Sequence, residues 1–208
     1  MKKILFTDSI DPSLVSQAAG ILRNNGILIH PTENLYGFGA NIYDNVSIQK
    51  IIELKHREKN TKGFVVLVSD FVQLDRLIAG VNRIEKNLMQ KYWPGPLTLI
   101  LRAKKEYWKN PVCYRKKIAV RMVGNDITRA ILKEANLPII STSINISGEK
   151  SINDPKLIEE KFRNEVDGMV IDKINHFSDK PSTIAKVIGR KVFVLRKGAI
   201  YKPSALVI

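Results

Sequence analysis

Two short polar segments carry residue types that could hold a polyphosphate. Lys55 and Arg57 stand one residue apart in ELKHREK, and Ser143 and Asn145 stand one residue apart in STSINISG. The first pair supplies positive charge, and the second supplies a hydroxyl and an amide that form directional hydrogen bonds. The sequence has no GxxxxGK(S/T) loop, and Ile42 stands where GxGxxG needs its third glycine. We therefore expect these two segments to form an anion site.

The position of Lys55 follows from the helical spacing of the residues before it. Residues 45–57 place Ile48, Ile51 and Ile52 at helical intervals, and Lys55 falls on the same apolar face. A lysine at the end of this face points toward the sheet edge, where it would meet a bound anion. The alternative is a lysine whose stem lies along the apolar face and whose charge complements the helix C-terminus.

Arg121 is a second candidate for an anion site. Within KIAVRM, residues 117–122, strand alternation places Arg121 on the same face as Ala119 and Val123. A partly buried arginine requires an anionic partner. That partner is either an Asp or Glu of the protein or the carboxylate or phosphate of a ligand, and the residues alone leave both open.

The segment PIISTS, residues 138–143, is an apolar strand that runs into a polar loop. Ser141, Ser143 and Asn145 alternate, so they would face one side if the chain stays extended. In α/β sheets, ligands bind where strands end in such loops. The same residue types also form ordinary turns, so this pattern alone is weak evidence for a site.

Helical and strand patterns alternate along the chain and predict the frame that positions these residues. The segment 36–39 is expected to be a glycine-rich loop. The interleaving predicts an α/β fold with helices on a mixed sheet, part of it antiparallel because the last three strands share one helix. Helices are expected at 11–26, 45–55, 70–79, 82–92, 126–136 and 154–163, and strands at 27–32, 63–69, 97–102, 117–122, 138–143, 168–172, 182–188 and 191–195.

Composition narrows the class of protein. The 208 residues are expected to form a single domain spanning 1–208. No stretch approaches the roughly 20 apolar residues that span a bilayer, and the apolar run at residues 4–6 is too short for a signal peptide. We therefore expect a cytoplasmic protein with no membrane partner. The single Cys113 excludes an internal disulfide, and the three histidines form no HExxH zinc motif.

The net charge of +14 suits anionic partners such as RNA or nucleotides. The charges are dispersed along the chain, so simple solubility charge is an equal explanation.

Seven segments in this order resemble the YrdC-like family: HPTENLYGFGANIYD, ELKHREKNTKG, KYWPGPLTLIL, IAVRM, STSINISG, KPSTIAKV and VLRKGAI. The resemblance covers about residues 10–200. The chain is similar to the short form of the threonylcarbamoyl-AMP synthases (TsaC type), which lacks the C-terminal domain of the long form. It implies a twisted mixed sheet flanked by helices, with a large basic cleft.

The resemblance also implies a reaction. L-Threonine, bicarbonate (or CO2) and ATP with Mg²⁺ would give threonylcarbamoyl-AMP and pyrophosphate by nucleotidyl transfer. A downstream threonylcarbamoyl-transfer complex would use this product to modify the adenosine beside the anticodon in tRNAs that read codons starting with A. The resemblance leaves open whether tRNA is a further partner that the protein binds directly.

The resemblance assigns roles residue by residue, and no protein side chain is assigned to a metal. The catalytic residues would be Lys55, Arg57, Ser143 and Asn145. The ATP site would consist of Lys55, Arg57, Lys59, Lys117, Ser143, Asn145, Ser151 and Arg196. The threonine site would consist of Thr32, Arg121, Ser141 and Ser182, with Arg121 on the threonine carboxylate.

Four positions depart from the family pattern. Glu58 stands where Pro is frequent, Gly63-Phe64 where the family often reads Pro-Leu, His30 where Tyr is usual, and Ile144 where Ala is common. None removes a charged or hydrogen-bonding group, but Glu58 and Gly63 would change loop stiffness near the phosphates.

Two other functions remain open on the sequence. An RNA-binding protein is favoured by the net charge and opposed by an aromatic content of only 7%. A related acyl- or carbamoyl-transfer enzyme of the same fold is the other alternative.

Overall fold

The computed structural model describes residues 1–56, 63–145, 150–175, 178 and 180–200. Within these residues the helices are α1 (Pro12–Arg23), α2 (Asn45–Leu54), α3 (Phe71–Leu77), α4 (Arg83–Tyr92), α5 (Asp126–Ala135) and α6 (Pro155–Phe162), with a short 3-10 helix at Lys105–Tyr107. The strands are β1 (Lys2–Phe6), β2 (Leu28–His30), β3 (Gly37–Asn41), β4 (Val65–Val68), β5 (Leu97–Arg102), β6 (Cys113–Tyr114), β7 (Lys117–Met122), β8 (Ile139–Ser143), β9 (Gly168–Asp172), β10 (Thr183–Ile188) and β11 (Lys191–Arg196).

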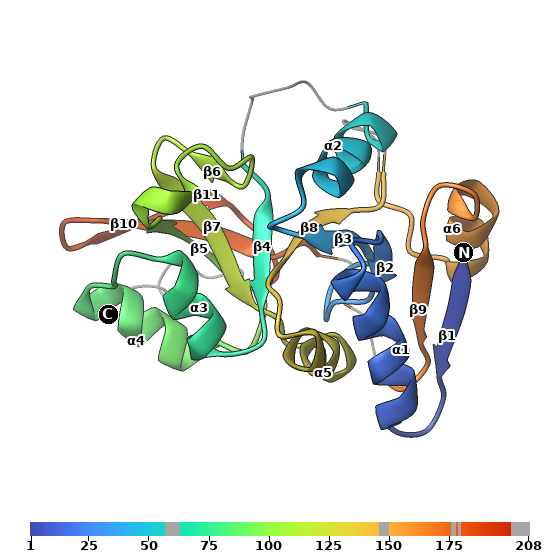
Figure 1. Cartoon of the computed structure of the whole chain (residues 1–208). Coiled ribbons are helices and arrows are strands. Elements are labelled where there is room, and N and C mark those ends of the chain that lie inside the picture. The colour runs from blue at the N-terminus through green and yellow to red at the C-terminus, as the bar shows by residue number, and fades with distance from the viewer. Residues whose placement is uncertain (57–62, 146–149, 176–177, 179, 201–208) are drawn as a thin grey trace.

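These strands form a mixed sheet flanked by helices (Figure 1). In the described part of the chain the order is β1-β9-β2-β3-β8-β4-β7-β5-β10-β11, with β6 paired to β7 at the side. β9 is parallel to β1 and β2, β4 to β7 and β5 to β10, while the other pairs are antiparallel. The predicted α/β class with a mixed sheet is therefore confirmed.

Three of the strands were not expected: β1, β3 and the two-residue β6. The segment 36–39, predicted to be a loop, lies mostly in β3, which is buried along its whole length between β2 and β8. The prediction was wrong because it read the glycines as turn signals, whereas here they leave room for neighbouring side chains. β1 was also missed, because its five residues pair only with β9, far away in sequence.

Local signals placed the helix starts well. Asp11 caps α1, with its carboxylate accepting from the backbone N–H of Ser13 at 2.7 Å, and Pro12 occupies the first helical turn. Asn82 and Glu85 form a reciprocal capping box at the start of α4. The helix that was predicted to end at Lys55 ends at Leu54, and Lys55 is its C-cap. In the described residues every helix is too short or too polar to cross a bilayer.

The core has two parts. Helices α1 and α5 pack against each other and bury Ala18, Leu22 and Ile131 in a cluster that includes Phe6 of β1. The larger cluster includes apolar residues of α2, α3, α4 and α6 together with the central strands. This packing fixes the strand ends that carry the polar residues.

Gly39 of β3 is expected to be intolerant of a side chain. A β-carbon at this position would lie 2.8 Å from His30 Cδ2 and 2.8 Å from Ile139 Cδ1, both in fully buried side chains. We expect Gly39→Ala to lower the free energy of unfolding by about 1–3 kcal/mol through overpacking. Urea denaturation measures this loss.

Gly20→Ala in α1 is the matched control, because a β-carbon there meets nothing within 4 Å. A helix interior favours Ala over Gly, so this change should raise stability by about 0.5–1 kcal/mol. Equal effects of the two substitutions would contradict the crowding argument.

Candidate functional site

A cavity of about 770 Å³ lies along the central strands of the sheet. Its walls include residues of β3, β4, β7, β8, β10 and β11. Arg121, Lys150 and Arg196 line it, and no Asp or Glu does so among the described residues. Three cations without a lining carboxylate favour an anionic ligand.

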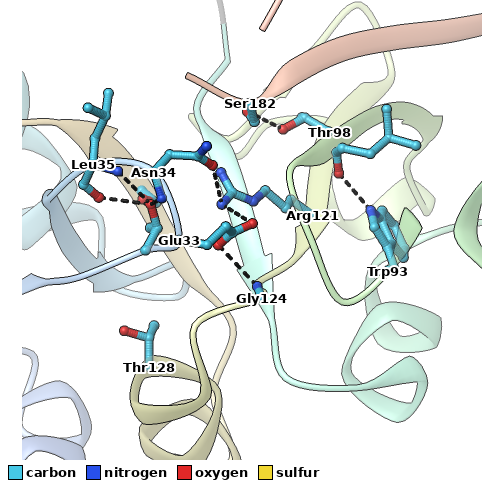
Figure 2. Close-up of polar contacts among 12 residues, drawn as sticks. Glu33, Asn34, Leu35, Trp93, Thr98, Arg121, Gly124, Thr128 and Ser182 are labelled. Carbon is cyan, nitrogen blue, oxygen red and sulfur yellow. Dashed lines mark hydrogen bonds and ion pairs between the residues drawn. The ribbon is translucent and has the colours of Figure 1, made fainter. Parts of the chain in front are cut away.

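Arg121 is buried, with 5% of its surface exposed, and it touches both the protein and the cavity. Its Nη2 atom forms an ion pair with Glu33 Oε1 and donates to Asn34 Oδ1 at 3.0 Å (Figure 2). Glu33 is held in turn by the backbone N–H of Gly124, at 3.1 Å from Oε2. The Nε–H of Arg121 has no hydrogen-bond partner among the described residues. Arg121 therefore has an internal partner and still has donor capacity for a ligand.

Arg196 and Ser182 form a second polar pair in the cavity wall. Arg196 donates to the Ser182 carbonyl at 3.1 and 2.8 Å and to the Ser182 hydroxyl at 2.9 Å. The Ser182 hydroxyl also lies 2.9 Å from Thr98 Oγ1 (Figure 2). Burial, and then the charge of Arg121, lower the pKa of Arg196. An anion between these two arginines would relieve their mutual repulsion.

Lys55, Ser143 and Asn145 come together as the sequence suggested. Lys55 is buried, and its Nζ donates to Ser143 O at 2.6 Å, Asn145 O at 2.7 Å and Asn145 Oδ1 at 2.8 Å. The Ser143 hydroxyl donates to the same Asn145 Oδ1 at 2.8 Å. An ammonium has three donors, so Lys55 ties the end of α2 to the turn after β8. Ser143 lines the cavity, while Lys55 holds the turn that carries it.

Thr32 and Ser141 also line the cavity, and each contacts the protein through its hydroxyl. Thr32 Oγ1 donates to Leu35 O at 2.8 Å and accepts from the backbone N–H groups of Asn34 and Leu35. Ser141 Oγ lies 3.2 Å from His30 Nε2. The remaining predicted residues divide into three groups. Ser151 lines the cavity, Lys117 is exposed at the first residue of β7 and does not, and Arg57 and Lys59 lie outside the described residues.

Sequence reasoning missed three contributors to this site: Glu33, Asn34 and His30. Glu33 and Asn34 follow Thr32 directly, and a polar run after a short apolar strand was the available signal. The sequence could not show that they pair with Arg121, which lies 87 and more residues away. His30 was noted only as a departure from a family pattern.

His30 gives the fold a defined pH dependence. Burial lowers its pKa from 6.5 to about 4, while its hydrogen bond to Pro31 opposes this and the charge of Arg121 adds to it. The unfolded chain therefore binds more protons than the folded chain between these pH values. The free energy of unfolding should fall by about 3 kcal/mol on this account as the pH drops from about 6.5 to about 4.

Urea denaturation of the wild type and of His30→Phe over this pH range measures the effect. The variant is less stable at neutral pH but lacks the His30 component, so its stability should depend less steeply on pH. Parallel pH profiles for the two proteins would contradict a neutral buried imidazole.

Comparisons with known proteins identify the family of the chain. The model of the Sua5/YciO/YrdC family, described as "Telomere recombination", matches residues 20–198. The chain is 34% identical over 161 residues to a threonylcarbamoyl-AMP synthase of Bacillus subtilis, covering 77% of this chain and 46% of that protein. It is 30% identical over 182 residues to a threonylcarbamoyl-AMP synthase of Idiomarina loihiensis, covering 85% of this chain and 95% of that protein.

A solved structure extends the likeness to three dimensions. The crystal structure of P. abyssi Sua5 complexed with L-threonine matches 95% of this chain and 58% of its own, with a TM-score of 0.84 and 26% identity. This chain thus spans about half the length of the B. subtilis and P. abyssi proteins and nearly all of the I. loihiensis protein. On the extent of the family match and the identity to these relatives, the chain belongs to the Sua5/YciO/YrdC family.

Proposed function

We propose that this protein is an ATP-dependent L-threonylcarbamoyladenylate synthase, a nucleotidyltransferase that makes threonylcarbamoyl-AMP and pyrophosphate from L-threonine, bicarbonate (or CO2) and ATP. One observation carries the proposal. A single cavity lined by Arg121, Arg196 and Lys150 also contains the hydroxyls of Thr32, Ser141 and Ser143. The names of the relatives and the L-threonine bound to P. abyssi Sua5 support the same substrates.

Arg121 is the proposed site for the threonine carboxylate. Its Nη2 atom is anchored by Glu33 and Asn34 and its Nε atom is buried, so another N–H of the guanidinium, on the side of the cavity, would form the contact with the ligand. Thr32, Ser141 and Ser182 would surround the rest of the amino acid, because all three line the same cavity. Charge-assisted pairing with a guanidinium fixes orientation as well as affinity.

Lys55, Arg57, Ser143 and Asn145 are the proposed residues around the ATP phosphates, with Lys59, Lys117, Ser151 and Arg196 further along the nucleotide. The Oδ1 atom of Asn145 accepts from Lys55 and Ser143, which holds this amide in place at the turn. Lys55 would contribute its positive charge and the shape of this turn, because its three donors already bind the turn. Arg196 and Ser151 line the cavity and would reach a nucleotide there.

The reaction would need no covalent enzyme intermediate. The threonine amine attacks CO2, an N–C bond forms and a proton leaves, which gives a carbamate. A carbamate oxygen then attacks the α-phosphorus of ATP; the new P–O bond forms as the bond to the bridging oxygen breaks and pyrophosphate leaves. The protein would contribute positioning and charge stabilisation.

Mg²⁺ is the proposed metal, bound as the ATP complex. In the described residues no cluster of three His, Cys, Asp or Glu side chains could hold a metal ion. Mg²⁺ usually keeps several waters and binds through substrate phosphates, so this donor set fits a metal carried by the nucleotide. Such an ion would neutralise charge on the phosphate oxygens.

We further propose that the protein acts in the cytoplasm as a single YrdC-like unit. Its product would pass to a downstream transfer complex that modifies tRNA. Direct binding of tRNA to the basic protein is a separate proposal, which the net charge of +14 supports.

Pyrophosphate release tests the proposed function. The protein is incubated with ATP, Mg²⁺, bicarbonate and L-threonine, and each component is then omitted in turn. We expect release to require all of them, with L-serine replacing L-threonine at a rate about tenfold lower, because one methyl group discriminates weakly. Release that ignores threonine would identify a different acceptor, and tRNA binding without any release would favour an RNA-binding protein.

A further inference from the structure

His30 of β2 contacts Ser141 of β8 across the whole width of β3. The two outer strands are about 10 Å apart, because each step in a sheet is nearly 5 Å. The register pairs His30 with Gly37 and Gly39 with Ser141, so two glycines lie beneath the imidazole. A β-carbon at Gly37 would lie 3.0 Å from Ser141 Oγ and 3.4 Å from His30 Nε2. The glycines therefore provide the space through which His30 reaches Ser141.

The direction of this hydrogen bond is fixed by the other ring nitrogen. His30 Nδ1 lies 3.1 Å from the carbonyl oxygen of Pro31, which can only accept. Nδ1 therefore carries the proton. Burial lowers the pKa of His30 to about 4, so the ring is neutral at neutral pH and Nε2 is an acceptor. Ser141 must then donate its proton to Nε2, at 3.2 Å.

A hydroxyl that donates its hydrogen bond to the protein can only accept a hydrogen bond from a ligand. Ser141 lines the cavity, so the lone pairs of its oxygen can accept from a donor there. An amine, an ammonium or a carbamate N–H is such a donor, whereas carboxylate and phosphate oxygens are not. The carboxylate site at Arg121 is therefore complementary to Ser141 and does not compete with it.

The spacing of Ser141 and Arg121 fits one amino acid. Both lie on the same sheet face, because Val65 of β4 pairs with Ser141 on one side and with Ala119 on the other. Two strand steps and two residues along the strand separate their α-carbons by about 12 Å. An arginine side chain and the carboxylate and amine of one small amino acid would together span this distance.

We infer that Ser141 accepts a hydrogen bond from the amino group of the amino-acid substrate, and that His30 is the positioning residue that makes Ser141 an obligate acceptor. This inference rests on the proposed function for the identity of the substrate. It assigns to His30 the orientation of the Ser141 hydroxyl, and it explains the two glycines of β3 as the space that the imidazole occupies.

Three variants separate the polarity of His30 from its volume. His30→Gln can place an amide oxygen near the position of Nε2 and so keep the acceptor for Ser141. His30→Asn can keep the donor to Pro31 but is too short to reach Ser141. His30→Phe fills the space and removes both. Circular dichroism and thermal melting establish that each variant folds.

Calorimetric binding compares L-threonine with (R)-3-hydroxybutanoate, which lacks only the amine. We expect the wild type to prefer L-threonine by roughly tenfold or more, because hydrogen bonds to a charged group are strong. His30→Gln should keep this preference, and His30→Asn and His30→Phe should each lose most of it. An equal preference in all four proteins, or no L-threonine binding by the wild type, would overturn the amine site.

The tautomer is tested without any substrate. Long-range ¹H–¹⁵N spectra distinguish a proton on Nδ1 from one on Nε2, and the His30 signals are assigned by their loss in His30→Asn. We expect the proton on Nδ1, and a proton on Nε2 would overturn the role of His30. If the proton and the amine preference are as expected but no threonylcarbamoyl-AMP forms, the proposed function fails and the amine site stands.

Discussion

Replacing Lys55 with Met is expected to lower pyrophosphate release by at least about a hundredfold, the loss typical when one stabilising donor is removed from an active site. Met keeps the length of the buried stem but removes the charge. Ser143 O, Asn145 O and Asn145 Oδ1 would then lose their shared donor, and the turn after β8 would lose its anchor to α2. Binding of L-threonine at Arg121 should change much less.

Lys50→Met is the matched control, because Lys50 is exposed on the same helix. It removes an identical charge from the surface of α2 and should leave turnover near the wild-type value. Stopped-flow or coupled-enzyme measurement of pyrophosphate gives both rates. Normal turnover in Lys55→Met would show that catalysis does not need Lys55. An equal loss of turnover in Lys50→Met would attribute the effect to the lower net charge of the protein.

Arg121→Lys is expected to raise the KM for L-threonine by about a hundredfold, because a lysine cannot reproduce the fork of donors that a guanidinium presents. The cation would still pair with Glu33, so the fold should survive. Arg102→Lys is the control, since Arg102 is exposed at the end of β5. Steady-state kinetics with threonine as the varied substrate measure both.

Glu33→Gln extends this prediction to the residue that holds Arg121. The variant removes the ion pair but keeps an acceptor for the Gly124 N–H, so we expect a smaller rise in KM, about tenfold. The double variant should show less than the sum of the two effects, because both act on one contact. Fully additive effects would separate Glu33 from the carboxylate site.

Periodicity predicted the parts of the site that lie within one element. Helical spacing placed Lys55 on the face of Ile48, and strand alternation placed Ser141 and Ser143 on one side of β8. The structure brings Lys55 to Ser143 and Asn145, 88 and 90 residues away. That pairing was suggested by residue type alone, because periodicity says nothing about which elements meet.

Pairing between distant elements accounts for what the sequence missed. Whether Arg121 meets Glu33 or only a ligand depends on how β7 lies relative to the loop after β2. The sequence also could not show that Gly37 and Gly39 make room for His30, since a glycine in a turn and one beneath a side chain look alike. β1 was missed for the same reason, because it is stabilised by β9.

The structure gives a different explanation for the glycine at position 63. The sequence suggested that this glycine alters the stiffness of the loop near the phosphates. In the structure a β-carbon at Gly63 would lie 2.6 Å from the carbonyl oxygen of Val112. The glycine thus permits a close approach of two backbone segments beside the cavity. Glu58, the other departure in this loop, lies outside the described residues.

The mass of the product made from ¹³C-labelled bicarbonate tests whether the enzyme joins a carboxylated threonine to AMP. We expect an adenylate that contains AMP, threonine and one labelled carbon, formed together with pyrophosphate and absent when threonine is omitted. A threonine adenylate without the labelled carbon, or pyrophosphate without any adduct, would contradict the claim that this cavity joins a carboxylated threonine to the α-phosphate of ATP.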